Sequence, residues 1–363
     1  MTDRTISGFN RRAVLGALGA APLLVTMPAF AQPPTPRRML LNSGYSGAQS
    51  WFFLAEDNGH MRRAGVRLDY TPGRGAYTAA PRLASEGFDV AFGDIYSMIE
   101  VVANAPRDQA DDLPIAVYAM FNRTPSMVAV NAAGPIDSPR ALVGRRVVGH
   151  ASDVALETFP ALASSIGIDP AMVDAGPRDA TMGAMLSDML AGEVDGVFGY
   201  VTTATAHAAA TGLALDRLRF LRFADHLPDF YGHALMVRRR LVREDPAFVS
   251  GLVRAINLGL ADTVRDPDSG IAAIVRRDPE ARPDIERGRL MGTLTGDMGH
   301  PEAARIGIGA VDPDRLRRSI RLHATTKRLP RVPELAEIFT PDFLPPATER
   351  VTSVVPGTGS RSG

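Results

Sequence analysis

The chain has 363 residues, no cysteine, and 40 basic against 40 acidic side chains, which leaves a formal net charge of zero. Balanced charge without a run of Lys and Arg argues against nucleic acid as a partner, because phosphate neutralisation needs clustered basic residues. The absence of cysteine excludes disulfides, thiolate chemistry and cysteine-type zinc sites, so packing alone must stabilise the fold.

The N-terminus has the pattern of an export signal. Paired arginines at 11–12 precede an apolar stretch rich in Gly and Ala, and residues 29–31 have the small-x-small form of a cleavage site. The pair favours a twin-arginine signal, while departures from the usual residues beside it leave the general secretory route open. Residues 1–31 are therefore expected to be cleaved between Ala31 and Gln32, and the mature chain to work in the periplasm.

The first part of the mature chain alternates short apolar strands with helical stretches. The hydrophobic spacing predicts strands over 39–42, 66–70, 89–92 and 115–121, and helices over 50–64, 76–86 and 94–105. Strands separated by helices of this length indicate parallel pairing in an α/β sheet.

A second unit of the same kind follows, and the chain then becomes mainly helical. Strands are predicted over 127–130, 146–149, 194–200 and 234–238, with helices over 154–166, 180–191, 246–265, 268–277, 283–294, 301–308 and 312–326. Residues 346–363, rich in Pro, Gly, Ser and Thr, are expected to form a disordered tail.

Five segments in order resemble one family of proteins. Residues 137–149 read D-S-P-R-A-L-V-G-R-R-V-V-G, close to a "D-S-P-x-D-L-x-G-K-x-V-G" segment with Ala141 in place of the acidic residue. The other segments are 189–196, 231–237, 244–267 and 329–345. Together they resemble the solute-binding proteins of ABC importers in the branch for sulfonates, nitrate, taurine and thiamine-pyrimidine precursors, the SsuA/THI5-like or NMT1-like proteins.

The resemblance implies a type II periplasmic-binding-protein fold, in which two α/β lobes are joined by a two-segment hinge. Lobe I would comprise 38–123 and 236–345, and lobe II would comprise 124–235. The hinge would lie near 122–126 and 226–233. The implied protein is not an enzyme: it is a monomer that captures a small organic solute between its lobes and delivers it to an ABC permease. Alternatives within the same fold are a pyrimidine-synthesising enzyme and a sensor subunit that presents ligand to a receptor.

The candidate ligand residues follow the predicted strands, because open α/β sheets bind ligands beyond the carboxyl ends of their strands. The loop at 43–49 offers small and polar residues before a helix N-terminus, and Trp51 is placed for stacking on a flat ligand or for core packing. We expect ligand contacts from Ser43, Tyr45, Ser46, Gln49, Trp51, Arg74, Asp94, His150, Ser152, Tyr200 and Tyr231.

Two of these residues point to different solutes. Arg74, between two glycines, favours an oxyanion such as a sulfonate, nitrate or carboxylate. Asp94, with nearby aromatic residues, favours a pyrimidine-like heterocycle, and its position also suits a helix N-cap. The sequence does not choose between these classes.

Catalytic residues are not predicted. The sequence has no nucleophile elbow and no phosphate loop, and its histidines lack the i, i+4 pairing of a metal-binding helix. No cofactor and no metal are expected. The enzymes that resemble this family use pyridoxal phosphate, a first-lobe lysine and a cysteine-rich motif, whereas this chain has only Lys327.

Overall fold

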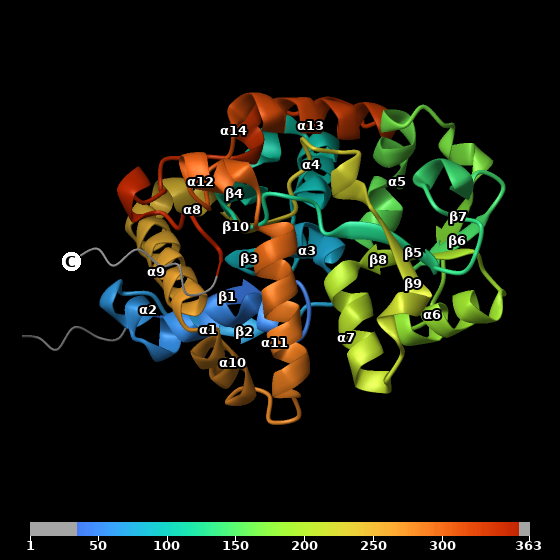
Figure 1. The fold of residues 1–363 in the computed structure, drawn as a ribbon. Helices are drawn as coiled ribbons and strands as arrows, with labels where there is room; N and C mark the ends of the chain where they lie inside the picture. Colours follow the sequence, from blue (N-terminus) through green and yellow to red (C-terminus); the bar gives the residue numbers. More distant parts are fainter. Residues whose placement is uncertain (1–34, 356–363) are drawn as a thin grey trace, which may run out of the picture. The chain divides into compact units, whose positions relative to one another are not determined.

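The computed structural model describes residues 35–355, so the predicted export signal and residues 356–363 of the predicted tail lie outside the described residues. Two five-stranded sheets form the frame (Figure 1). The first sheet has the order β2-β1-β3-β10-β4, with β1 Arg37–Leu40, β2 Leu68–Thr71, β3 Val90–Asp94, β4 Pro114–Ala119 and β10 His233–Arg238. The second has the order β7-β6-β8-β5-β9, with β5 Ser126–Asn131, β6 Arg146–Gly149, β7 Asp174–Pro177, β8 Gly196–Tyr200 and β9 Leu218–Arg222.

Each sheet contains one strand that runs against its neighbours. In the first sheet, which we call lobe I, β1 is parallel to β2 and β3, whereas β10 is antiparallel to β3 and β4. In the second, lobe II, β6 is parallel to β7 and β8, whereas β5 is antiparallel to β8 and β9. The antiparallel strands β5 and β10 are the first strands after the chain passes from one sheet to the other.

Helices cover both sheets. Their bounds are α1 Ser50–Asp57, α2 His60–Arg63, α3 Ala79–Ser85, α4 Ile95–Asn104, α5 Val154–Ser165, α6 Met182–Ala191, α7 Val201–Thr211, α8 Arg239–Glu244, α9 Pro246–Arg265, α10 Pro267–Val275, α11 Pro283–Gly292, α12 Pro301–Ile306, α13 Pro313–Thr326 and α14 Leu335–Ile338. Short turns include η1 Gly47–Gln49, η9 Ala347–Glu349 and a π-helical turn, η8 Thr293–Asp297. Within the described residues, α13 contacts α4 of lobe I and α5 of lobe II, and Figure 1 shows it lying above both sheets.

Helix α9 is long and apolar enough to cross a membrane by length and composition alone. It is instead a core helix, since 61% of its apolar window is buried and it packs against α1. The two backbones approach closely at Gly259, where an added Cβ would lie 2.3 Å from the Trp51 carbonyl oxygen. Glycine is therefore required at this contact.

Several predicted bounds need correction. The predicted helix 50–64 is broken between α1 and α2 at Gly59, whose φ of +73° favours glycine. The predicted lobe boundary after residue 235 falls inside β10, all of which belongs to the first sheet. Strands β7 and β9 were not predicted, because β7 is short and contains Gly and Pro, and β9 places arginines among its apolar residues.

The prediction of a disordered tail from residue 346 is wrong for residues 346–355. Val351 and Val354 are only 9% and 5% exposed, and both join the lobe I core. The Val351 carbonyl accepts a hydrogen bond from the Ile308 amide at 2.8 Å. Arg350 donates to the Pro345 and Ile306 carbonyls. A composition rich in Pro, Gly and Thr did not reveal these two buried valines.

Two chain segments cross between the lobes, at 120–125 and 223–232, and they pair with each other. The Thr124 amide donates to the Phe230 carbonyl at 3.1 Å, and the Gly232 amide donates to the Phe121 carbonyl at 3.0 Å. An added Cβ at Gly232 would lie 2.8 Å from the Arg123 carbonyl oxygen, so this approach also requires glycine. The two lobes are therefore joined by two chain segments that are hydrogen-bonded to each other.

Candidate functional site

A cavity of about 410 Å³ lies between the two lobes. Its walls come from the segments that follow β1, β2, β6, β7 and β8, and residues of the crossing segments, β10, α11 and η8 complete the lining. The lining residues of lobe I and the crossing segments are Asn42, Ser43, Ser46, Ala48, Arg74, Gly75, Ala76, Phe121, Pro125, His233, Arg289, Thr293 and Asp297. Those of lobe II are His150, Ser152, Asp153, Val154, Ala180, Thr181, Met182, Met185, Tyr200, Thr202 and Thr203.

Six residues predicted from the sequence line this cavity. They are Ser43, Ser46, Arg74, His150, Ser152 and Tyr200. The structure thus brings together residues up to 157 positions apart, because the carboxyl ends of strands from both lobes face the same space. Their contact with a ligand remains a prediction.

Three of the predicted aromatic residues, Tyr45, Trp51 and Tyr231, do not line the cavity. Trp51 is fully buried, with Phe52, Phe92 and Phe121 around its ring, so it packs in the core instead of stacking on a ligand. Tyr45 lies edge-on to Phe53, and it does not line the cavity. Tyr231 does not line the cavity either.

Tyr231 belongs to a buried polar cluster beside the crossing segments. Its hydroxyl donates to Glu302 Oε1 at 2.6 Å, and the Arg315 guanidinium lies 4.2 Å from its ring centroid. Burial and the neighbouring Glu302 carboxylate raise the pKa of the Tyr231 phenol, so it stays protonated. This tyrosine fixes the crossing segments and is absent from the cavity wall.

Gln49 and Asp94 lie just behind the cavity wall. Gln49 is fully buried, and its amide donates to Asn42 Oδ1 and to Ser43 Oγ, both of which belong to lining residues. Asp94 is fully buried and caps α4, accepting from the Tyr96 amide at 2.8 Å. The N-cap interpretation of Asp94 therefore holds. Neither Gln49 nor Asp94 lines the cavity, and their contact with a ligand stays a prediction.

The buried Asp94 carboxyl should make the stability of the protein depend on pH. Burial raises the pKa of Asp94 to about 8 from an ordinary value of 3.8. A carboxyl with a higher pKa in the folded state holds its proton there while the unfolded chain loses it, so its contribution to stability falls as pH rises between about 4 and about 8. Asparagine keeps the capping oxygen without the charge. We expect the stability advantage of Asp94→Asn over the wild type to grow with pH across this window and then level off.

Urea unfolding across that pH range measures the effect. Asp69→Asn is the matched control, since Asp69 is exposed on β2. A difference between Asp94→Asn and the wild type that does not change with pH would contradict a raised pKa at this carboxyl.

The sequence did not point to His233, the first residue of β10. Its side chain is 1% exposed and lines the cavity, and its Nε2 lies 3.4 Å from the Tyr200 hydroxyl of the opposite lobe. Burial lowers the pKa of His233 to about 3, so the imidazole is neutral at ordinary pH. A histidine that opens a buried strand resembles a core residue in sequence, and only the topology places it at the cleft.

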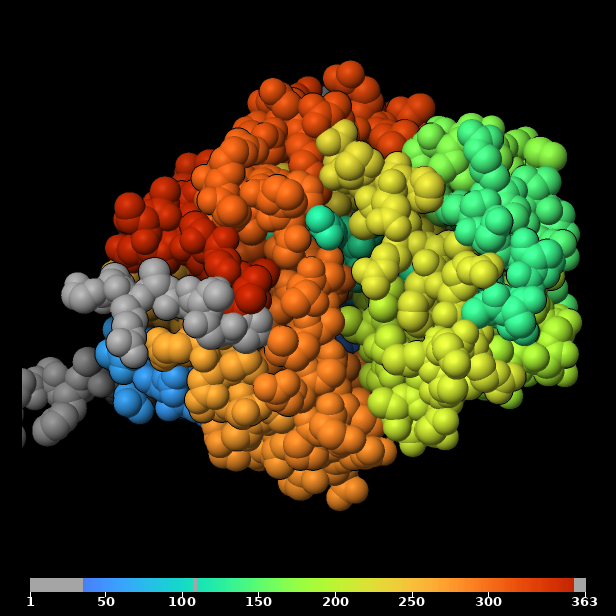
Figure 2. All heavy atoms as spheres, in the orientation of Figure 1, coloured from blue at the N-terminus to red at the C-terminus, as the bar shows by residue number. Residues whose placement is uncertain are grey.

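The sequence also missed the wall made by α11 and η8. Arg289, Thr293 and Asp297 recur every four residues along one face and line the cavity. Figure 2 shows the orange residues of α11 meeting the yellow-green residues of α7 from lobe II. At this contact an added Cβ on Gly292 would lie 2.9 Å from Thr202 Cγ2. A π-helical turn of this kind is frequent at functional sites.

The helix start after the 43–49 loop, which the sequence suggested as a ligand contact, is already engaged by another part of the protein. The Gly47 amide at the start of η1 donates to Glu286 Oε2 of α11 at 2.7 Å. An added Cβ at Gly47 would lie 2.0 Å from the Glu286 carbonyl oxygen, so the turn and the helix are tightly packed. A carboxylate of the chain itself therefore binds the amide at this helix N-terminus. Gly47 and Glu286 are 239 positions apart, so the sequence alone gives no sign of this contact.

No metal centre is formed by the described residues. Within 35–355, no group of three His, Cys, Asp or Glu side chains is arranged to hold a metal ion. The polar side chains around the cavity are instead hydroxyls, the Asn42 amide, two arginines, two histidines and two carboxyls. This donor set suits hydrogen bonding to a small polar molecule.

The sheet orders, the two crossing segments and the cavity between the lobes define the type II periplasmic-binding-protein fold. The chain belongs to the NMT1/THI5-like family, whose model matches residues 49–270, more than half of its length. A search of curated proteins gives no match.

Solved structures share this fold. The alkanesulfonate-binding protein SsuA from Xanthomonas axonopodis pv. citri, bound to MOPS, aligns with a TM-score of 0.62 at 14% identity, covering 85% of this chain and 99% of its own. The periplasmic aliphatic sulphonate binding protein SsuA from Escherichia coli aligns with a TM-score of 0.64 at 14% identity, covering 86% and 94%. The desulfurization enzyme DSZB aligns with a TM-score of 0.53 at 15% identity, covering 85% of this chain and 97% of its own. The fold is therefore also found in an enzyme.

Proposed function

We propose that this chain is the extracytoplasmic solute-binding protein of an ABC importer, which holds a small organic solute between its lobes and passes it to a membrane permease. The main support for this proposal is the cavity between the lobes, because polar residues from loops of both sheets line it. Ser152 of lobe II donates to the Arg74 carbonyl of lobe I at 3.3 Å. Such a contact links solute capture to lobe closure.

Two further observations support this proposal. The structures of SsuA proteins, described as sulfonate-binding, have the same fold. The sequence of residues 1–31 has the pattern of an export signal, which would place the mature chain with the solute in the periplasm. A sulfonate or related oxyanion and a pyrimidine-like heterocycle are the two solute classes to test.

Arg74, which lines the cavity, can distinguish these two classes. It is exposed on the loop after β2, where its planar guanidinium can meet an oxyanion from solvent. Arg146→Gln provides a matched control, because Arg146 is an exposed arginine on β6 that does not line the cavity.

The test is a thermal-shift screen of the mature chain, residues 32–363, against alkane- and arylsulfonates, nitrate, aromatic carboxylates and aminopyrimidines. The whole C-terminal segment is kept because Val351 and Val354 are buried. A solute at about 100 times its Kd should add roughly 2.7 kcal/mol to the free energy of unfolding. For an oxyanion, Arg74→Gln should reduce the shift and Arg146→Gln should not. If no compound raised the melting temperature of folded protein that was shown to be free of carried-over solute, the result would count against the proposal.

A further inference from the structure

The only lysine of the chain, Lys327, joins the two lobes by an ion pair. It directly follows α13, which extends from α14 of lobe I to α5 of lobe II (Figure 1). The Lys327 ammonium lies 2.5 Å from Glu157 Oε2 of α5 and 3.5 Å from Glu100 Oε1 of α4. One cation therefore pairs with a carboxylate of each lobe.

Buried groups of lobe I hold this lysine in place. Glu100 Oε1 also lies 2.9 Å from His323 Nε2, and the His323 side chain is fully buried. The centroid of the His323 ring lies 5.0 Å from that of Tyr96. The side chains of Lys327 and Glu157 are themselves only 21% and 27% exposed. Water and salt screen such a pair less than an exposed one, and its anchoring reduces the side-chain entropy lost in forming it.

The lobe II partner of this ion pair leads directly to the cavity. Glu157 lies one helical turn after Asp153, the N-cap of α5, and its amide donates to the Asp153 carbonyl at 3.1 Å. Ser152, Asp153 and Val154 line the cavity. Because a hydrogen-bonded helical turn moves as a unit, the position of Glu157 determines where this wall of the cavity lies.

The lobe I side of the ion pair also reaches the cavity. Tyr77, in η2 Ala76–Thr78, directly follows Ala76, which lines the cavity. Burial and the carboxylates of Glu100 and Glu157 raise the pKa of the Tyr77 phenol, which lies within range of both groups. The ion-paired groups are therefore next to a cavity wall in each lobe.

Resting on the proposed function, we infer that Lys327 is a positioning residue for solute binding. It does not line the cavity, but through Glu157 it holds the first turn of α5 against lobe I and so sets the separation of the two cavity walls. The polar contact at the walls themselves is longer, since Ser152 Oγ lies 3.3 Å from the Arg74 carbonyl oxygen. Loss of the ion pair shifts the lobes toward arrangements in which these walls are farther apart.

The distance between the lobes can be measured without any solute, because a chain that lacks cysteine accepts labels only at introduced cysteines. Asp69→Cys on β2 and Met172→Cys in η5 Pro170–Met172 place one spin label in each lobe, at residues that are exposed. Double electron–electron resonance gives the distribution of distances between the labels. Lys327→Met and Glu157→Gln should each shift this distribution to longer distances, whereas Lys327→Arg, which keeps the charge, should shift it less.

A double variant and a control on the same helix locate the effect in the ion pair. Lys327→Met leaves the Glu100 and Glu157 carboxylates near each other without the cation, so adding Glu157→Gln should bring the lobes part of the way back. Arg321→Met removes an exposed cation of α13 and should leave the distribution unchanged. Retained cooperative unfolding verifies that each variant is folded.

The same variants should change solute affinity. Propane-1-sulfonate and 4-amino-2-methylpyrimidine serve as probes of the two solute classes, and isothermal titration of the mature chain gives Kd for each. For a probe that binds, Lys327→Met should raise Kd by about threefold or more, because the binding-competent arrangement of the lobes is less populated. Arg321→Met should leave Kd unchanged.

These measurements separate this inference from the proposed function. A distance distribution that Lys327→Met leaves unchanged, or a double variant whose lobes are no closer than those of Lys327→Met, overturns the inference. A bound probe whose Kd does not change in Lys327→Met overturns it as well. If neither probe binds the wild type, the result counts against the proposed function, and the distance measurement alone decides whether Lys327 positions the lobes.

Discussion

Replacing Arg315 with methionine is expected to lower the free energy of unfolding by about 3–5 kcal/mol, because it would leave a buried carboxylate without its partner. Arg315 is 6% exposed, and its guanidinium donates to the Glu302 carboxylate, which is itself buried. It also donates to the backbone carbonyls of both crossing segments, at Asn122, Pro228 and Phe230. One side chain of α13 therefore holds the two crossings together.

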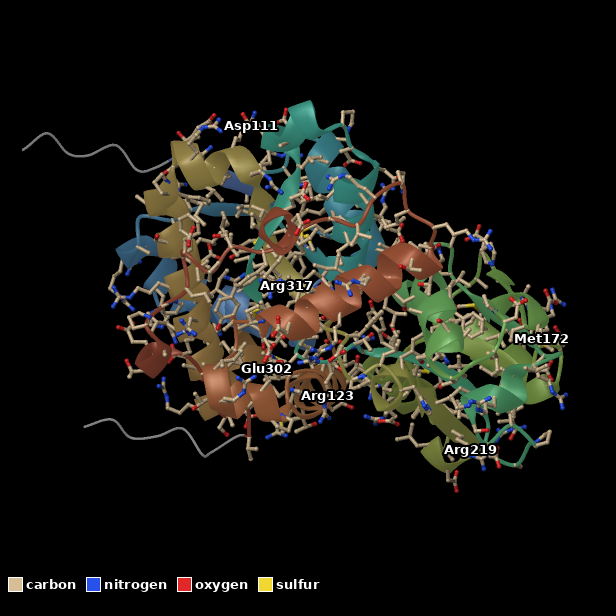
Figure 3. The ribbon with its side chains drawn as sticks, turned by 90° about the horizontal axis from the view of Figure 1, so that it is seen from above. Asp111, Arg123, Met172, Arg219, Glu302 and Arg317 are labelled. Atoms are coloured by element: carbon tan, nitrogen blue, oxygen red, sulfur yellow. The ribbon has the colours of Figure 1, made fainter. Side chains whose placement is uncertain are left out.

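Figure 3 places Glu302 and Arg123 at the junction between the lobes, where this network lies. The double variant Arg315→Met with Glu302→Gln should recover part of the loss, because it removes the isolated charge. Arg317→Met is the matched control on the same helix. Arg317 is 53% exposed and pairs with Asp314, so its loss should cost less than about 1 kcal/mol.

Urea unfolding of the four proteins measures these differences. A loss from Arg315→Met no larger than that from Arg317→Met would show that the network contributes little to folding. A double variant less stable than Arg315→Met would show that Glu302 is satisfied without its arginine.

The sequence predicted the alternation of strands and helices because each strand is a short apolar run followed by a polar loop. It also predicted six cavity residues, because position after a strand determines which loops face the cleft. Trp51 shows the limit of this reasoning. An aromatic residue at a helix start can face a ligand or the core, and only the packing of α9 and β3 beside it decides which.

The rest of the site depends on contacts between residues far apart in the chain. Glu286 reaches Gly47 across 239 positions, and His233 meets Tyr200 only because β10 returns to the first sheet. Asp297 faces the cavity because the helix widens to a π-helical turn after Gly292. Hydrophobic periodicity contains no signal for any of these three arrangements.

Gly75→Ala is expected to weaken binding of the solute found in the screen by about tenfold or more, since it would disfavour the lobe arrangement that encloses the solute. An added Cβ at Gly75 would lie 2.6 Å from Ser152 Oγ of the opposite lobe. Gly75 also has a φ of +116°, which L residues rarely adopt, so some loss of folding stability should accompany the change.

Two variants separate the clash between lobes from the backbone strain. Ser152→Gly in the Gly75→Ala background removes the side chain that the new methyl group meets, and it should restore part of the affinity. Gly65→Ala is the control for positive φ alone: Gly65 has a φ of +69° with no atom within 4 Å of an added Cβ. It should lower stability and leave Kd unchanged. If Gly65→Ala weakened binding as much as Gly75→Ala did, the effect would come from general destabilisation. If Ser152→Gly restored nothing, contact between the lobes at this point would not govern closure.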